Sequence, residues 1–412
     1  MREMKDSGIE WIGEIPKDKN LVRNKYMFNY IKGKLPKNTN KNGKGFPYIG
    51  ASDLESSSDV YEVYTEDEEL PEADIDDLLI LWDGARAGLS GTRKKGKISS
   101  TIVKICVTDD KVYKPFLYWY YKGFEKYMFD MVTGTTIPHM NRKYIEDIYF
   151  IEWTMEEQKR IADYLDEKCA KIDSIIEKQQ AIIEKLKEYK LSVITEMVTK
   201  GLNQDVEMKD SGVDYIGHVP KSWQVLKFGR CVDIKSNLVS PDLYKDYPQI
   251  APDGIEKASG KLLNYKTVEE SGVISWNHLF YKGQIIYSKI RPLLDKVIIA
   301  PFDGLCSADM YPIETKNNSK FTIYMILSDY FHSQVAMVTE NRVKMPKINQ
   351  SELANIMVAL PPEKEQLEIS TYLDSKCGAI DKTIDDRREF IDKLHNYKKA
   401  LIYEVVTGKR EV

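Results

Sequence analysis

The chain has 412 residues, of which 42% are hydrophobic and 30% charged, a composition typical of two or three domains with packed cores. Its apolar runs are far shorter than a membrane-spanning helix and its N-terminus lacks a signal-peptide core, so we expect a cytoplasmic protein without membrane segments. The formal net charge of −4 argues against a generally basic nucleic-acid binder but leaves room for local basic loops.

The N-terminal segment, residues 1–16, is a leader whose sequence is repeated later in the chain. Its residues MKDSG at 4–8 recur at 208–212, within a second leader at residues 202–220. Self-similarity of this kind indicates a tandem duplication. We therefore expect each leader to introduce one of two variable domains, at residues 17–153 and 221–361.

Both variable domains alternate short strand-like runs with helical stretches. The predicted strands lie at residues 77–82 and 98–107 in the first domain, and at 284–289 and 296–301 in the second. Helical stretches follow at 115–131 and at 321–338. Near the domain ends, Pro138 and Asn141 match Pro346 and Asn349. We interpret each variable region as a mixed α+β domain.

A long helix follows each domain, at residues 154–201 and 362–412. In both helices apolar residues recur every three or four positions, in the same register. Thr154 and Glu157 have the spacing of a capping box, and Pro362 stands where a first helical turn accepts proline. About 46 residues span roughly 69 Å of helix, more than one core needs, which favours pairing of the two helices over packing of each on its own domain.

Short connections predict the direction of this pairing. The first helix ends at Gly201, and only the second leader separates it from a domain that leads directly into the second helix. The predicted fold is therefore two α+β domains in tandem, each followed by a long helix, with the helices forming an antiparallel coiled-coil spacer of pseudo-twofold symmetry. We expect the domains at opposite ends of this spacer, and the leader at 1–16 against the end of the second helix.

Signatures of catalysis are absent from the sequence. The five histidines are scattered without ligand spacing, and the five cysteines form no C-x-x-C pair. Gly91, Gly96 and Lys97 have P-loop spacing, but Ile98 stands where a Ser or Thr hydroxyl must hold Mg²⁺. We expect no catalytic residue, no metal site and no cofactor bound by this chain.

Lysines and arginines interleaved with asparagines form loops in both domains, and such side chains contact phosphates and base edges. In the first domain the candidates for DNA binding are Lys37, Asn38, Asn40, Lys41, Asn42, Lys44, Arg86, Arg93, Lys94, Lys95, Lys97, Asn141 and Arg142. In the second they are Lys289, Arg291, Lys296, Asn341, Arg342, Lys344 and Lys347. One such cluster alone fits a solvated surface, whereas recurrence in two domains favours DNA binding.

The apolar stripe of the long helices is wider than a two-helix seam needs. Ile176 and Ile183 flank the seam in the first helix, and Ile384 and Ile391 are their equivalents in the second. We expect these four residues to bind a partner, two copies of which would dock on the two equivalent positions.

Four features carry a family resemblance: the leaders MKDSGIEWIGEIP and MKDSGVDYIGHVP, the PPEKEQ start of the second helix, the two Tyr-Leu-Asp helices and the segment GLCSADM at 304–310. Together they resemble the specificity subunits of type I restriction-modification systems over nearly the full length. One departure is the start of the first helix, at 153–158, which lacks the prolines of the second.

The resemblance implies two target-recognition domains, each reading one half of a split, asymmetric sequence in double-stranded DNA. It also implies two modification subunits that methylate adenine with S-adenosylmethionine, and restriction subunits that use ATP and Mg²⁺. This chain itself resembles a reader without catalysis. Two other classes stay open: an enzyme with an unrecognised active site, and a coiled-coil scaffold that binds only protein.

Overall fold

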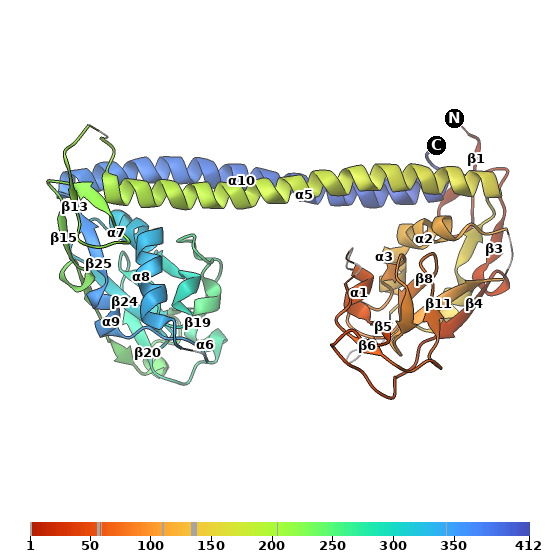
Figure 1. Ribbon diagram of the computed structural model, residues 1–412, viewed down its shortest axis with the longest axis horizontal. Coiled ribbons are helices and arrows are strands. Elements are labelled where there is room, and N and C mark those ends of the chain that lie inside the picture. Colours follow the sequence, from red (N-terminus) through yellow and green to blue (C-terminus); the bar gives the residue numbers. More distant parts are fainter. Residues whose placement is uncertain are drawn as a thin grey trace. The chain divides into compact units, whose positions relative to one another are not determined.

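The computed structural model describes residues 2–55, 58, 60–108, 111–132, 138–203, 205–342 and 344–412. The chain divides into two compact units (Figure 1). Unit 1 comprises Met1–Gln179 and Glu389–Val412, and unit 2 comprises Gln180–Arg388. Each unit therefore contains one variable domain and a segment of both long helices.

Unit 1 begins with the leader hairpin of β1 (Met4–Asp6) and β2 (Glu14–Pro16). The ends of its domain are joined by the antiparallel pair β3 (Leu21–Arg23) and β12 (Tyr149–Ile151). One antiparallel sheet has the order β4 (Phe28–Lys32), β11 (Ile102–Val107), β8 (Leu78–Leu81) and β9 (Ser90–Gly91). A second sheet has the order β6 (Tyr64–Thr65), β5 (Phe46–Ile49), β10 (Gly96–Ile98) and β7 (Glu72–Ala73). The helices are η1 (Asn24–Tyr26), α1 (Ala51–Glu55), α2 (Lys114–Gly123), α3 (Glu125–Asp130), α4 (Arg142–Asp147) and α5 (Met155–Lys200).

Unit 2 repeats this plan. The leader hairpin is β13 (Met208–Asp210) with β14 (His218–Pro220), and the domain ends pair as β15 (Gln224–Lys227) with β25 (Met357–Leu360). The first sheet has the order β16 (Val232–Ile234), β24 (Met310–Thr315), β21 (Ile285–Ser288) and β22 (Val297–Ile299). The second has the order β17 (Leu238–Val239), β20 (Asn277–Phe280), β23 (Gly304–Cys306), β18 (Pro248–Ile250) and β19 (Lys266–Thr267).

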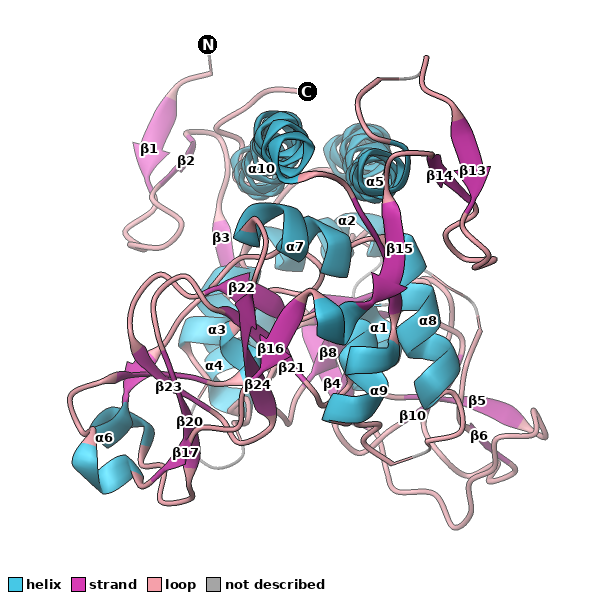
Figure 2. Cartoon of the chain, turned by 90° about the vertical axis from the view of Figure 1, so that its left-hand side faces the viewer, coloured by secondary structure: helices cyan, strands magenta, loops and turns pink. Residues whose placement is uncertain are grey.

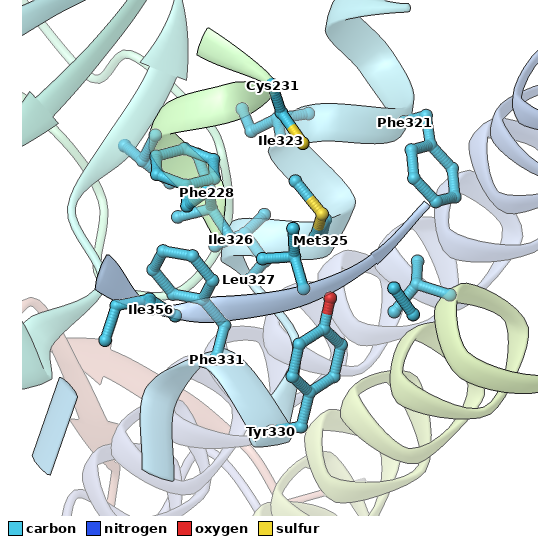
Figure 3. Close-up of a cluster of buried hydrophobic side chains, with 14 of the residues drawn as sticks. Phe228, Cys231, Phe321, Ile323, Met325, Ile326, Leu327, Tyr330, Phe331 and Ile356 are labelled. Atoms are coloured by element: carbon cyan, nitrogen blue, oxygen red, sulfur yellow. The ribbon is translucent and has the colours of Figure 1, made fainter. Parts of the chain in front are cut away.

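The helices of unit 2 are mostly short. They are η2 (Phe228–Arg230), η3 (Pro241–Leu243), η4 (Pro252–Gly254), α6 (Val268–Ser271), η5 (Pro292–Leu294), α7 (Ser319–Ile326), α8 (Asp329–Thr339), α9 (Gln350–Asn355) and α10 (Glu363–Val406). Figure 2 shows α7 between the long helices and the strands of the first sheet. Side chains of η2, α7 and α8 meet in one buried core with β25 (Figure 3), where Phe228 and Phe331 pack edge to face with ring centroids 5.3 Å apart.

The predicted strands and helices are largely present, but three of them are each divided in two. The run predicted as one strand at 98–107 is divided between β10 and β11, because Ile102 N–H donates to the Ser99 carbonyl and closes a turn. The helical stretches at 115–131 and 321–338 are each divided into two helices, at Phe124 and at 327–328. All four residues of β8 are buried, as the continuous apolar run predicts for a central strand.

The α5 and α10 segments run antiparallel within each unit, which confirms the predicted direction. In unit 1, Lys398 Nζ lies 2.7 Å from Asp173, and Trp153 Nε1, just before α5, donates to the Val406 carbonyl near the end of α10. In unit 2, Lys190 Nζ lies 2.8 Å from Asp381. Lys190 and Lys398 are equivalent residues of the repeat, as are Asp173 and Asp381, so each unit contains one copy of the same ion pair. The placement of the domains at opposite ends of the spacer stays a prediction.

Two neighbouring residues dock each long helix onto its domain. Gln158 accepts from Tyr113 N–H at 2.8 Å and donates to the Lys111 and Trp153 carbonyls. Its equivalent in unit 2, Gln366, accepts from Asn318 N–H at 3.1 Å and donates to the Pro361 carbonyl. The reciprocal Thr154–Glu157 capping box predicted for α5 is also present. These buried polar contacts explain why a Glu-Gln pair opens both helices.

The first leader lies against the end of α10. Tyr403 hydroxyl donates to the Ile12 carbonyl at 2.9 Å, and Lys409 Nζ donates to the same carbonyl. In unit 2, Ile216 and Val219 of the second leader belong to the same buried cluster as Val198 of α5.

Candidate nucleic-acid interface

Two loops, one in each unit, have the same backbone hydrogen-bond pattern. Loop 1 comprises residues 81–89, which follow β8, and loop 2 comprises residues 288–296, which follow β21. Leu81 N–H donates to the Leu89 carbonyl in loop 1, and Ser288 N–H donates to the Lys296 carbonyl in loop 2. These pairs differ by 207 residues at both ends, so the two loops are equivalent parts of the duplicated domain.

Both loops are fastened to the segment that precedes a short helix. In unit 1, Gly84 N–H donates to the Pro138 carbonyl at 2.9 Å, before α4. In unit 2, Arg291 N–H donates to the Pro346 carbonyl at 2.8 Å, before α9. The sequence match between Pro138 and Pro346 therefore has a structural role, since each proline supplies the acceptor that holds its loop.

Several predicted DNA-binding residues of unit 2 lie on this assembly. Arg291, Asn341, Lys344 and Lys347 are exposed, and Lys289 is half-buried with its Nζ 5.2 Å from the centre of the Tyr311 ring. Lys347 pairs with Asp309 at 3.0 Å in an exposed ion pair, which DNA phosphates can replace at low cost. Loop 2 and the segment before α9 thus present a basic surface.

The equivalent surface of unit 1 contains fewer cations. Arg86 is exposed at the tip of loop 1 and lines a pocket with Phe129 and Pro138. Arg142 is also exposed, and its Nε donates to Glu146 at 2.6 Å. Asn141 accepts from Lys143 N–H at 2.9 Å and so caps α4. Its side-chain oxygen is engaged in the fold, which leaves only its amide group for another contact.

The loop at residues 37–44 lies elsewhere in unit 1, before β5. Lys37, Asn38, Lys41, Asn42 and Lys44 are exposed, and Lys37 pairs with Glu69 at 3.3 Å. Asn40 is half-buried and organises the loop. Its Oδ1 accepts from the backbone of Asn42 and Lys44, and its Nδ2 donates to the Lys44 carbonyl.

The basic loop at 91–97 contains both buried and exposed cations. Lys94 and Lys97 are each only 4% exposed. Lys94 Nζ donates to the Ser58 carbonyl, and Lys97 Nζ donates to Glu72 at 2.9 Å. Both predictions are wrong, because a lysine amine is buried where backbone carbonyls and a carboxylate replace its water.

The remaining residues of this loop, Arg93 and Lys95, are exposed. Arg93 lies 3.5 Å from Asp166 of α5, and Lys95 lies 3.2 Å from Asp74. The loop therefore faces the long helix, and loop 1 is a separate feature of the domain.

Two predicted residues of unit 2, both half-buried, make contacts within the fold. Arg342 makes a two-point contact with Glu352 of α9 and donates to the Lys347 carbonyl, and its guanidinium holds the pKa of Glu352 below the usual range. Lys296 Nζ donates to the Pro252 carbonyl at 2.6 Å. Both side chains support the segments that carry the exposed cations.

The four isoleucines predicted to bind a partner are buried within the chain itself. Ile176, Ile183, Ile384 and Ile391 are 4–9% exposed, so they cannot form an apolar surface for another protein. The prediction is wrong because these side chains are enclosed within the chain and leave almost no apolar surface for another protein.

Tyrosines of the long helices form two equivalent pairs, and all but the half-buried Tyr164 are exposed. In unit 2, Tyr189 and Tyr372 are 47% and 41% exposed, and Lys376 Nζ lies 5.8 Å from the centre of the Tyr189 ring. The equivalent residues in unit 1 are Tyr397, 50% exposed, and Tyr164. We name these pairs the tyrosine patches. The repeat offset of 208 residues links both pairs, so the sequence already contained the signal for them.

No group of three His, Cys, Asp or Glu side chains within the described residues is arranged to hold a metal ion. In the same part of the chain, no helix combines the length and the hydrophobicity that a membrane span requires. Duplicated α+β domains that present equivalent loops define a two-module binding protein. The comparisons with known proteins identify the ligand.

The model of the type I restriction modification DNA specificity domain matches residues 16–191 and 221–387. The chain therefore belongs to this family and contains two copies of its domain. It is 29% identical to the Type I restriction enzyme EcoDI specificity subunit of Escherichia coli, over 96% of this chain and 90% of that protein. It is 28% identical to the MjaVIII specificity subunit of Methanocaldococcus jannaschii, over 97% of this chain and 94% of that protein.

A solved structure from a study of complex assembly and conformational transition of the type I R-M system has the same fold. Its TM-score is 0.70 at 13% identity, over 95% of this chain and 98% of that one. The family assignment confirms the predicted fold class and the predicted function in sequence-specific DNA recognition.

Proposed function

We propose that each unit reads one half of a split DNA site through loop 1 or loop 2, and that the two halves differ in sequence. The observation that supports this is the equivalence of the loops in backbone and their difference in side chains. Loop 1 presents Arg86 between two alanines, and loop 2 presents Arg291 followed by Pro292 and Leu293. Different side chains on one frame contact different base edges.

The chain directs partner subunits to this site and has no catalytic role of its own. S-adenosylmethionine bound by modification subunits supplies the methyl group for adenine, and restriction subunits use ATP and Mg²⁺. The relatives that support this assignment are named as specificity subunits. Each tyrosine patch binds one modification subunit, and the two equivalent patches give two copies per chain.

Two experiments test the proposal. Adenine methylation is mapped in cells that contain the modification subunit, with and without this chain, and a split motif is expected only when the chain is present. Exchange of residues 221–361 for the corresponding domain of another specificity subunit is then expected to change one half of that motif. A change in both halves would contradict the division of recognition between the units.

Two assays with the purified chain distinguish the alternative classes of protein. Methylation of DNA by the purified chain alone would make it an enzyme. Failure to retard any duplex, alone or with the modification subunit, would make it a protein scaffold.

A further inference from the structure

Loop 2 has an unusual backbone on both sides of η5. Arg291 has φ of 44° and Asp295 has φ of 46°, in the left-handed region that side chains with a Cβ rarely adopt. The equivalent residues of loop 1 are Gly84 and Gly88, with φ of 118° and 98°. Unit 1 therefore fills these positions with the residue that suits the backbone, whereas unit 2 has charged side chains there.

Two more strained residues contact loop 2. Ala258, with φ of 51°, donates its N–H to the Leu294 carbonyl at 3.2 Å. Met345, with φ of 50°, precedes the Pro346 carbonyl that accepts from Arg291 N–H. Strain of this kind persists only where surrounding contacts hold the backbone, and it gathers at sites of function.

An ion pair fastens the far end of loop 2 to α8. His332 Nδ1 lies 2.7 Å from Asp295 Oδ2, and the two side chains are 34% and 16% exposed. The two residues before His332 are Tyr330 and Phe331, which are buried in the core of unit 2 (Figure 3). Because these rings fix α8, His332 is a rigid anchor for Asp295.

Loop 1 is held in a different way. A Cβ at Gly88 would lie only 3.1 Å from the Phe129 ring and 3.3 Å from the Met128 backbone, so close packing against α3 leaves no space for an anchoring side chain. The ion pair is thus specific to unit 2.

We propose that Asp295 and His332 form a positioning pair that holds loop 2, and with it Arg291, in the conformation that contacts DNA. This inference rests on the DNA-reading role of loop 2 proposed above. Arg291 and Asp295 are four residues apart and flank the single turn η5. Loss of the contact between Asp295 and His332 therefore lets the backbone of loop 2 move, and the orientation of the Arg291 side chain changes with it.

The pair makes DNA binding by unit 2 dependent on pH. The groups that face His332 are Asp295 on loop 2, Asp329 on its own helix and Lys257. The hydrogen bond that His332 donates to the Asp295 carboxylate raises the pKa of His332 above its ordinary value of 6.5, against the effects of burial and of Lys257. The charged pair is complete below pH 6.5 and is lost as the pH rises through the raised pKa.

The test measures the affinity of the full chain with its modification subunit for two duplexes between pH 6 and 9. One carries the split motif obtained by methylation mapping, and the other has the half read by unit 2 scrambled. We expect His332→Gln to weaken binding of the motif about tenfold at pH 6, and to remove the pH dependence. Affinity for the scrambled duplex should change little.

Three further variants keep the test sharp. His332→Lys retains a positive charge at high pH and should keep its affinity at pH 8.5, where the wild type weakens. Asp295→Gly removes both the strained backbone conformation and the contact with His332. It should therefore bind the motif as weakly as His332→Gln does, without a lower melting temperature. Asp329→Asn removes a neighbouring charge that does not contact loop 2. It should bind the motif like the wild type at pH 6 and lose affinity at a lower pH than the wild type does, because the Asp329 carboxylate helps to raise the pKa of His332.

His332→Gln and Asp295→Gly variants that bind the motif like the wild type at every pH would overturn the positioning role, and so would a pH dependence that survives in His332→Gln. A wild-type complex that binds both duplexes equally would instead overturn the DNA-reading role of unit 2. The two failures are therefore distinguishable.

Discussion

Glu157 and Glu365 are equivalent residues that bind different partners. Glu157 accepts from Lys19 at 2.6 Å and from Arg2 at 2.8 Å, whereas Glu365 accepts from the indole N–H of Trp223 at 2.9 Å. Burial would raise the pKa of Glu157, but Lys19, the Thr154 N–H and Arg2 outweigh it and lower the pKa to about 2. Two cations thus bind the glutamate in unit 1, whereas an uncharged indole donor binds its equivalent in unit 2.

The first prediction concerns this network. Glu157→Gln should lower the free energy of unfolding at pH 7 by about 2–3 kcal/mol, because an amide cannot balance two cations. The folded-state pKa lies below the ordinary value of 4.5, so the stabilisation is present above about pH 4.5 and is lost as the pH falls toward 2. Urea unfolding followed by circular dichroism from pH 7 to pH 3.5 measures the difference.

Glu365→Gln is the matched control, because its amide oxygen still accepts from Trp223. It should cost well under 1 kcal/mol at pH 7. A deficit in Glu157→Gln that stays constant down to pH 3.5 would contradict the electrostatic explanation.

The second prediction separates lysines that bind DNA from lysines that stabilise the fold. Lys344→Ala should weaken binding to all duplexes and reduce the slope of log K against log salt by about 0.9, the value for one phosphate contact. Lys97→Ala should leave that slope unchanged and lower the melting temperature, because Glu72 and the Glu68 carbonyl lose their buried partner. Salt titrations and thermal unfolding of both variants check this, and a reduced slope in Lys97→Ala would refute it.

At the scale of elements, the long helices contain the same ion pair twice in different surroundings. The side chains of Lys398 and Asp173 are 25% and 49% exposed, and those of Lys190 and Asp381 are 13% and 22% exposed. Less water around the second pair strengthens its interaction. Both pairs join α5 to α10 and favour the antiparallel direction.

The third prediction is that the pair in unit 2 has the larger coupling energy. Double-mutant cycles with alanine should give about 0.5 kcal/mol for Asp173 with Lys398, and about 1–2 kcal/mol for Lys190 with Asp381. Lys261 also contacts Asp381 at 3.2 Å, so the second cycle is measured with Lys261 replaced by alanine as well. Equal coupling energies would show that exposure does not control the strength of these pairs.

At the scale of the whole molecule, the duplicated sequence gives the chain two equivalent tyrosine patches. Under the function proposed above, these are the two positions at which modification subunits bind. Because Tyr189 and Tyr397 are equivalent residues, each should contribute to one copy of the same partner contact. The buried isoleucines beside them contribute to the stability of the helix pair instead.

The fourth prediction tests this assignment. A chain with either Tyr189→Glu or Tyr397→Glu should bind one modification subunit, and a chain with both changes should bind none. Each change places a charge in an apolar contact with the subunit. Size-exclusion chromatography with light scattering measures the mass of each complex. All three variants should melt like the wild type, whereas Ile183→Asp should unfold unit 2. A double variant that still binds two copies would place the contact elsewhere.

Much of the fold could be predicted because its signals are local. Periodic apolar residues and a capping box at Thr154 are properties of short segments, and they indicate two long helices. A repeat offset of 208 residues that holds along both helices indicates a duplicated domain. The site was predicted only in part. Loop 1 and loop 2 are separated by 207 residues and the segments that hold them by 208, so a single-residue shift concealed the equivalence of Gly84 and Arg291.

The sequence by itself therefore determined the duplication, the helix pair and the family of DNA specificity subunits. Only the tertiary structure decided which cations face solvent and which isoleucines are covered. Lys94 and Lys97 have the same side chain as Lys344, but carbonyls and carboxylates from distant segments surround the first two. The burial of a charge depends on whether the rest of the chain replaces its water, and residues far apart in the sequence make that replacement.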